Sequence, residues 1–196
     1  MTSTTARAPG RVLADLLPGS LVRDVLLIAA AAALTGLAAQ ILIKLPFTPV
    51  PITLQTFTVL LSGAALGPRR GTAAMLLYLV VGVAGFGWFA EGRSGIAFPS
   101  FGYIVGFVVA AGVVGALARR GADRSVVGTI GLMVVGNLVI YAIGLPWLMV
   151  ALGVDLSKGL QFGVTPFLIG DGLKILLAAG LLPGTWRLVG AGSRER

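Results

Sequence analysis

The sequence predicts an all-α integral membrane protein with six transmembrane helices and both termini in the cytoplasm. Hydrophobic residues make up 57% of the 196 residues, charged residues only 11%, and the mean hydropathy is +0.98. A soluble globular domain carries about 25% charged residues, so a chain this poor in charge cannot cover a water-facing surface. A bilayer is therefore the expected solvent for most of the chain.

Six apolar runs provide the predicted spans, because a spanning helix needs about 20 predominantly apolar residues. The second run is shorter than this. The six runs cover 25–43, 52–66, 72–90, 101–118, 126–152 and 164–182. Between them we predict loops at 44–51, where three prolines preclude a helix interior, at 91–100 and at 155–163. This gives a tail at 1–22, a transmembrane domain at 23–190 and a second tail at 191–196.

The distribution of basic residues predicts the orientation, because Lys and Arg in short loops favour the cytoplasmic side. With six spans, the side that holds both termini carries 11 basic residues and the opposite side carries 3: Lys44, Arg93 and Lys158. The proline-rich loop and the loop with Arg93 are then expected to face outward, and membrane lipid surrounds the spans.

Several function classes are disfavoured by what the sequence lacks. It contains no cysteine and no histidine, which removes thiolate metal ligands and the commonest general base. It has no Gly-rich phosphate loop of the kind that binds ATP. The net charge of +8 comes from basic residues between apolar runs, so we expect no nucleic-acid partner. We also expect no cofactor and no metal.

Asp171 and Lys174 are the charged residues inside the predicted spans, where charge is costly and usually functional. Their spacing of three places them on one helix face. They either form an ion pair that fixes helix packing or face a cavity and bind a polar ligand. In the preceding span, Asn137 and Tyr141 share a face at a similar depth, so we include both in the candidate site. An ordinary interhelical hydrogen bond is the alternative for Asn137.

Two further side chains lie near the predicted outer surface. Arg93 is the arginine expected outside, where it is either solvated or closes over an anionic ligand with a bidentate contact to a carboxylate. Gln55 begins the second span beneath the proline-rich loop, where its side-chain amide can form hydrogen bonds with both the donors and the acceptors of a ligand.

The chain resembles the BioY family, the biotin-binding S components of energy-coupling-factor (ECF) transporters. The resemblance covers nearly the whole chain after the N-terminal tail. Its specific parts are Pro-Val-Pro-Ile-Thr-Leu-Gln-Thr-Phe at 49–57 and Gly-Asp-Gly-Leu-Lys at 170–174. Weaker matches lie at 60–71, 77–82, 92–95 and 101–107. The chain departs from the family at 98–102, where it has Phe-Pro-Ser-Phe-Gly instead of Gly-Pro-Thr-Gly-Gly, and at 85–88.

The resemblance implies a six-helix protein of the bacterial cell membrane that binds biotin near the outer side, beneath a lid formed by the loop between the first two helices. It also implies a transmembrane T component and two ATPase subunits that supply energy. Asp171, Lys174, Arg93 and Gln55 fall on ligand-binding positions of the family. Ala29 and Ala33 fit the small-residue spacing by which the first helix contacts the T component.

Three alternatives stay open from the sequence. An S component for another vitamin would share the architecture but not the Gly-Asp-x-x-Lys motif. A proton-coupled carrier would use Asp171 as its relay. A membrane enzyme is the least favoured, because the chain has neither histidine nor cysteine.

Overall fold

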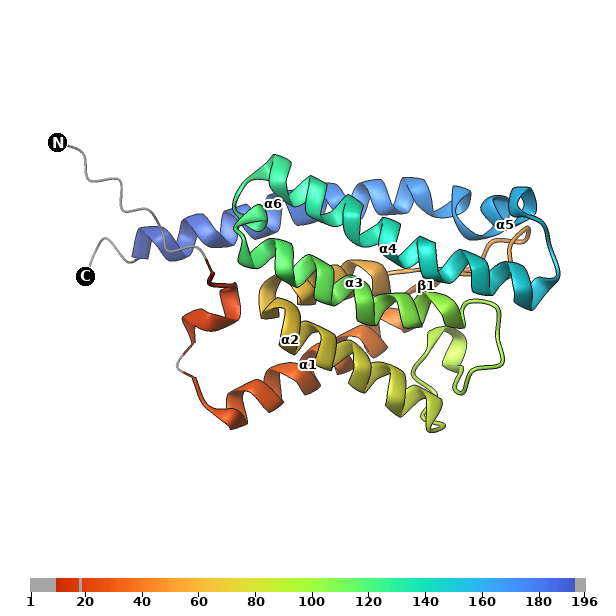
Figure 1. Ribbon diagram of the computed structural model, residues 1–196, viewed down its shortest axis with the longest axis horizontal. Helices are drawn as coiled ribbons and strands as arrows, with labels where there is room; N and C mark the ends of the chain where they lie inside the picture. The colour runs from red at the N-terminus through yellow and green to blue at the C-terminus, as the bar shows by residue number, and fades with distance from the viewer. Residues whose placement is uncertain (1–9, 18, 193–196) are drawn as a thin grey trace.

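The computed structural model describes residues 10–17 and 19–192, which form a bundle of long helices with one small β-hairpin (Figure 1). The α-helices are α1 (Leu21–Gln40), α2 (Gln55–Val83), α3 (Phe101–Arg119), α4 (Val126–Leu152), α5 (Leu156–Gly163) and α6 (Leu168–Gly192). Short 3₁₀ turns lie at Leu13–Leu16, Ala90–Gly92, Ala122–Arg124 and Thr165–Phe167. The strands β1 (Leu42–Ile43) and β2 (Ile52–Thr53) pair antiparallel, with Leu42 opposite Thr53.

Four helical segments of the described chain are long and apolar enough to cross a membrane. They are Leu21–Gln40, Phe101–Arg119, Val126–Leu152 and Leu156–Val189, the last of which contains α5 and α6. Local signals set two of the starts, since the hydroxyl of Ser20 caps α1 and that of Ser125 caps α4. The predicted first, fourth and fifth spans thus correspond to α1, α3 and α4.

Helix α2 folds back on itself at Gly67. This residue has φ 81° and ψ 177°, a backbone conformation that favours glycine, and Pro68 then starts the next turn. A Cβ on Gly71 would lie 3.0 Å from the Cα of Gly63, and the hydroxyl of Tyr78 donates to Oε1 of Gln55 at 2.9 Å. The arms 55–66 and 68–83 therefore run antiparallel and correspond to the predicted second and third spans. The third span ends earlier than predicted, at Val83 instead of residue 90, because residues 84–89 form a turn and loop before the 3₁₀ turn Ala90–Gly92.

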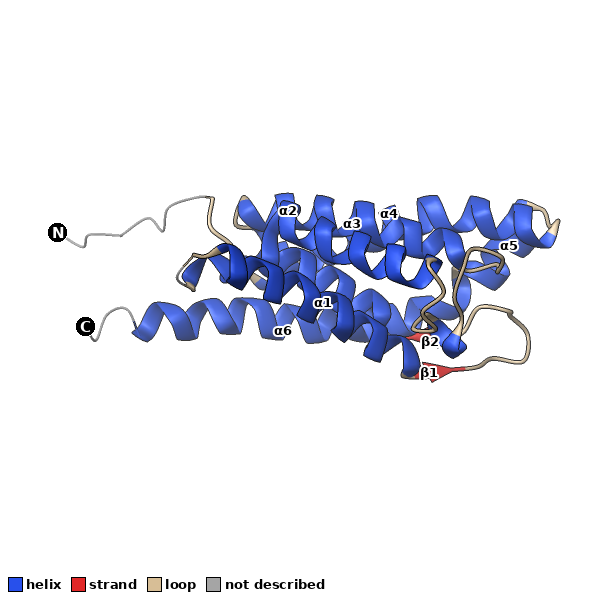
Figure 2. Ribbon diagram, turned by 90° about the horizontal axis from the view of Figure 1, so that it is seen from below, coloured by secondary structure: helices blue, strands red, loops and turns tan. Residues whose placement is uncertain are grey.

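The helices pack through small residues at close contacts. α3 lies between α2 and α4, α1 packs against α2, and α6 packs against α4 (Figures 1 and 2). A Cβ on Gly63 would lie 2.7 Å from the carbonyl oxygen of Ala111, and one on Gly106 would lie 3.1 Å from the Cα of Ile140. Glycine at these positions lets the backbones of neighbouring helices approach closely, as is common in membrane bundles.

The predicted loop at 155–163 is wrong, because residues Leu156–Gly163 form the helix α5. The side chain of Asp155 accepts a hydrogen bond from the backbone N–H of Lys158 and caps this helix. The last span also starts later than predicted, at Leu168 instead of Val164, since Thr165–Phe167 forms a 3₁₀ turn that contains Pro166.

The described part of the N-terminal tail packs on the end of the bundle where α6 ends (Figure 1). Val12 is completely buried and covers Gly67 at the fold of α2. Asp15 forms an ion pair with Arg70 at 2.8 Å, and the N–H of Gly10 donates to the carbonyl of Arg119. These contacts place residues 10–17 against the bundle and give them a defined structure.

Candidate ligand-binding site

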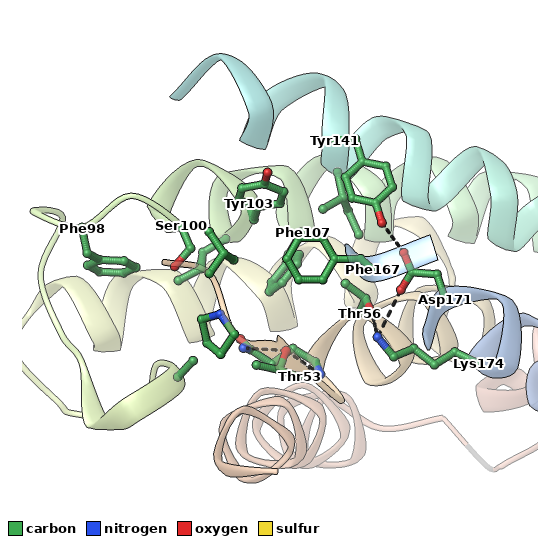
Figure 3. A pocket seen from close by; sticks show the side chains of 16 residues that line it. Thr53, Thr56, Phe98, Ser100, Tyr103, Phe107, Tyr141, Phe167, Asp171 and Lys174 are labelled. Carbon is green, nitrogen blue, oxygen red and sulfur yellow. Dashed lines mark hydrogen bonds and ion pairs between the residues drawn. The ribbon is translucent and has the colours of Figure 1, made fainter. Parts of the chain in front are cut away.

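A pocket lies towards the end of the bundle that carries the β-hairpin, whose place Figure 2 shows. It lies between the starts of α2, α3 and α6, the middle of α4, and the two loops that precede α2 and α3 (Figure 3). Its walls are formed by Val50, Pro51, Thr53, Gln55, Thr56, Ala90, Phe98, Ser100, Tyr103, Ile104, Phe107, Ile140, Tyr141, Phe167, Asp171 and Lys174. Segments distant in sequence therefore converge on one cavity.

Asp171 lies at the centre of a polar cluster on one wall of this pocket (Figure 3). One of its carboxylate oxygens accepts a hydrogen bond from the hydroxyl of Tyr141, and the other accepts from Nζ of Lys174 at 3.1 Å. The ammonium also donates to the hydroxyl of Thr56 at 2.8 Å. Asp171 and Lys174 are 5% and 9% exposed, so a charged pair with partners from α2 and α4 is held in a nearly dry site.

The position of Asp171 in the first turn of α6 favours its negative charge. The N-terminus of a helix carries a partial positive charge from its unpaired N–H groups. The late start of α6 at Leu168 therefore puts the carboxylate closer to the helix end than a span starting at Val164 would.

Gln55 lines the pocket from the first turn of α2 and is held by two neighbours. Its Oε1 accepts from Tyr78, and its Nε2 donates to the hydroxyl of Thr53 at 3.1 Å. A side-chain amide has two N–H donors and two lone pairs. One donor and one lone pair thus remain for a ligand.

Aromatic side chains form the wall between the polar cluster and the loops that precede α2 and α3. Tyr103 packs edge-to-face on Tyr141 with ring centroids 6.4 Å apart, and its hydroxyl donates to the carbonyl of Gly163 at 2.9 Å. Phe98, Phe107 and Phe167 complete this apolar surface. The predicted site included Tyr141 but not Tyr103, Thr56 or the three phenylalanines. Thr56 lies next to Gln55 in the proline-rich motif, which was the available signal.

Arg93 does not line the main pocket; it lines a second cavity together with Lys44, Leu45, Thr48, Pro49, Pro51 and Glu91. Pro51 borders both cavities, and the guanidinium of Arg93 lies 5.7 Å from the ring centroid of Phe98, which lines the main pocket. Arg93 therefore lies beside the main pocket, at the mouth that Phe98 and Pro51 border.

The remaining predicted residues lie outside both cavities. Asn137 is 7% exposed and sits one turn along α4 from Tyr141, but it does not line the pocket. Ala29 and Ala33 lie on an exposed face of α1. The structure thus brings together Asp171, Lys174, Tyr141 and Gln55, and leaves Asn137 in the helix packing.

The arrangement suits a small ligand with a polar head and an anionic end. The buried carboxylate accepts N–H donors, the ammonium and the amide offer further hydrogen bonds, and the aromatic wall takes up an apolar middle. The cations at the mouth are placed for an anionic group.

Sequence comparison identifies relatives over most of the chain. The model of the BioY family matches residues 5–191. A probable biotin transporter BioY from Pyrococcus horikoshii is 38% identical over 159 residues, which is 80% of this chain and 91% of the relative. The biotin transporter BioY of Thermotoga maritima is 36% identical over 140 residues, which is 70% of this chain and 81% of the relative.

The fold also has a solved counterpart. The crystal structure of the S component for biotin from an ECF-type ABC transporter superposes with a TM-score of 0.76, at 22% sequence identity, covering 85% of this chain and 92% of that one. The bundle described above therefore has the fold of a transporter S component. With the family match over nearly the whole length and the identity to curated relatives, this chain belongs to the BioY family.

Proposed function

We propose that this protein binds biotin from outside the cell and is the substrate-specific membrane subunit of an ECF transporter for biotin uptake. The observation that carries the proposal is the buried cluster of Asp171, Lys174 and Tyr141 at the wall of an aromatic-lined pocket. The relatives bear the name biotin transporter, and the structural neighbour is an S component for biotin.

The chemistry of biotin matches the two ends of the site. Its ureido ring offers two N–H donors and a carbonyl, for which Asp171 is the acceptor and Lys174 or Gln55 the donor. Its apolar ring and side chain run along the aromatic wall. Its carboxylate then reaches the mouth, where Arg93 lies beside Phe98. Asp171 acts here as a hydrogen-bond acceptor fixed by two partners, which favours a binding role over the proton relay of a coupled carrier.

In this proposal the chain crosses the bacterial cell membrane six times, with both termini in the cytoplasm. Four long apolar segments and the two arms of α2 supply the six crossings. The arms are shorter than the bilayer core, and α1 and α3 pack against them. The excess of arginine at the end that carries the N-terminal segment supports the orientation.

Energy for import comes from partner subunits, since this chain has no phosphate-binding loop. We propose a transmembrane T component and two ATPases as these partners. The exposed Ala29 and Ala33 on α1 offer a small-residue surface on which another membrane helix can pack closely. The chain itself is then a transporter subunit and not an enzyme.

Binding of labelled biotin to the purified protein without ATP tests the proposal. We expect saturable binding of one biotin per chain, competition by unlabelled biotin, and none by thiamine or riboflavin at the same concentration. Absence of saturable biotin binding, together with saturable binding of another labelled vitamin in the same assay, would assign the site to that vitamin and overturn the proposal.

A further inference from the structure

The outer cavity contains a carboxylate of the protein itself, Glu91, between two cations. Its Oε1 lies 2.8 Å from Nζ of Lys44, and its Oε2 lies 2.5 Å from a guanidinium nitrogen of Arg93. Lys44 follows β1 in the loop before α2, whereas Glu91 and Arg93 belong to the loop before α3. The two loops that cover the site are thus joined through one acidic side chain.

The local backbone holds this carboxylate in place. Glu91 has φ 64° and ψ 25°, the left-handed region, and it is the non-glycine residue of the described chain with positive φ. Such a conformation costs about 1 kcal/mol or more and is retained where the surroundings demand it. The Glu91 side chain is 18% exposed, whereas Lys44 is 70% exposed. The acid is therefore the more enclosed member of the cluster.

The cluster directly adjoins the ligand pocket. Ala90, which precedes Glu91, lines the main pocket, while Glu91 lines the outer cavity. Pro51 separates the two cavities and contributes to both. A ligand whose polar head is at Asp171 and whose chain runs outward past Phe98 would bring an anionic end to the two cations that Glu91 already engages.

We infer that the Glu91 side chain occupies the carboxylate-binding position between Arg93 and Lys44 and competes there with the carboxylate of a ligand. This competition sets how strongly the site favours an anionic ligand. This inference rests on the proposed function and adds two residues to it: Lys44 as a second cation carried by the lid loop, and Glu91 as the anion that ligand binding displaces. Entry of a ligand carboxylate exchanges one carboxylate for another at the same cations, and the displaced Glu91 turns to water.

The test measures the affinity of biotin and of uncharged biotin amide for the parent and for Glu91→Gln by isothermal titration. Glutamine keeps the size and the backbone cost but lacks the negative charge, so it competes for the cations only through a neutral amide oxygen. Biotin should bind the variant about 2- to 10-fold more tightly, the scale for releasing two partly exposed ion pairs, while the amide changes little. Higher salt should reduce the gain, because exposed charges are screened.

One control and one further test variant separate the inference from simpler explanations. Asp155→Asn removes one negative charge from another exposed loop and should leave the ratio of the two affinities unchanged, because Asp155 caps α5 and lines neither cavity. Lys44→Gln, at an exposed side chain, should weaken biotin about 2-fold or more and spare the amide.

The inference is overturned if Glu91→Gln leaves biotin affinity unchanged or weakens both ligands equally, because Glu91 would then be a tether between loops. It is also overturned if Lys44→Gln affects neither ligand. If the parent binds neither biotin nor its amide, the proposed function itself is wrong. If the parent binds both ligands but Glu91→Gln does not change the ratio of their affinities, only the inference about Glu91 is wrong.

Discussion

Tyr141 on α4 donates a hydrogen bond from its hydroxyl to the carboxylate of Asp171 on α6, whose other oxygen accepts from Lys174. The three side chains come from two helices and leave the carboxylate facing the pocket with both oxygens fixed. Asp171 is therefore positioned before any ligand arrives, which lowers the ordering cost of binding.

Loss of the Tyr141 hydroxyl should weaken biotin binding. In Tyr141→Phe, Asp171 loses one of its fixed donors, and we expect an affinity loss of about 1.5 to 3 kcal/mol, the scale of a hydrogen bond to a charged group. Tyr103→Phe is the matched control, since it removes a hydroxyl from the same pocket wall that bonds Gly163 instead. Equal losses in both variants by isothermal titration would contradict a special role for the Tyr141–Asp171 contact.

Thr56 should position the ammonium of Lys174. Thr56→Val keeps the shape but removes the acceptor at 2.8 Å, so we expect biotin to bind about 3- to 10-fold more weakly. Thr58→Val is its control, because Thr58 bonds the backbone of Gln55 and does not line the pocket. If the control weakens binding as much as Thr56→Val, the effect comes from α2 as a whole.

The proposed topology predicts which loops an impermeant thiol reagent reaches in intact cells. Cysteines at Ser94 and Ser157 should react, and cysteines at Ser125 and Ser193 should react only after the cells are opened. The chain contains no native cysteine, so the background is clean. The reverse labelling pattern would refute the orientation argued from the arginines.

Asp123, in the turn between α3 and α4, should make stability depend on pH. It is fully buried, and this burial raises the pKa of its carboxyl above the ordinary 3.8, although a hydrogen bond from Trp186 opposes the shift. Because the pKa of Asp123 is higher in the folded than in the unfolded state, its contribution to the free energy of unfolding is fully present below pH 3.8. This contribution is lost as the pH rises through the folded-state pKa.

Asp123→Asn removes this titration. The melting temperature of the variant relative to the parent should therefore increase from pH 4 towards pH 7, as measured by thermal unfolding in detergent. A constant difference over this range would show that Asp123 does not titrate on folding.

The bundle could be predicted from the sequence largely because hydropathy reports directly on membrane spans. The sequence also separated the two arms of α2, since Gly67, Pro68 and two arginines interrupt the apolar pattern there. It missed α5 because the polar residues of 155–163 are typical of a loop, and the cap provided by Asp155 is a short-range signal that is easily outweighed.

The site could be predicted in part, for a different reason. Asp171 and Lys174 stand out because charge inside a span is rare, and Tyr141 followed from helix depth. Asn137 met the same depth criterion but faces the packing, because depth does not fix how a helix is rotated. The link between Lys44 and Glu91 could not be predicted, since it depends on how two loops meet in space.

The most direct test of the account is the affinity of biotin for the purified parent and for Asp171→Asn, with Asp155→Asn as the charge-matched control. Asparagine keeps the shape but removes the charge and replaces one acceptor oxygen with a donor. We predict that Asp171→Asn weakens binding by about 2 kcal/mol or more, close to 30-fold, while the control binds as the parent does. If the folded Asp171→Asn protein binds biotin as tightly as the parent, the pair of Asp171 and Lys174 is structural and biotin does not bind where we place it.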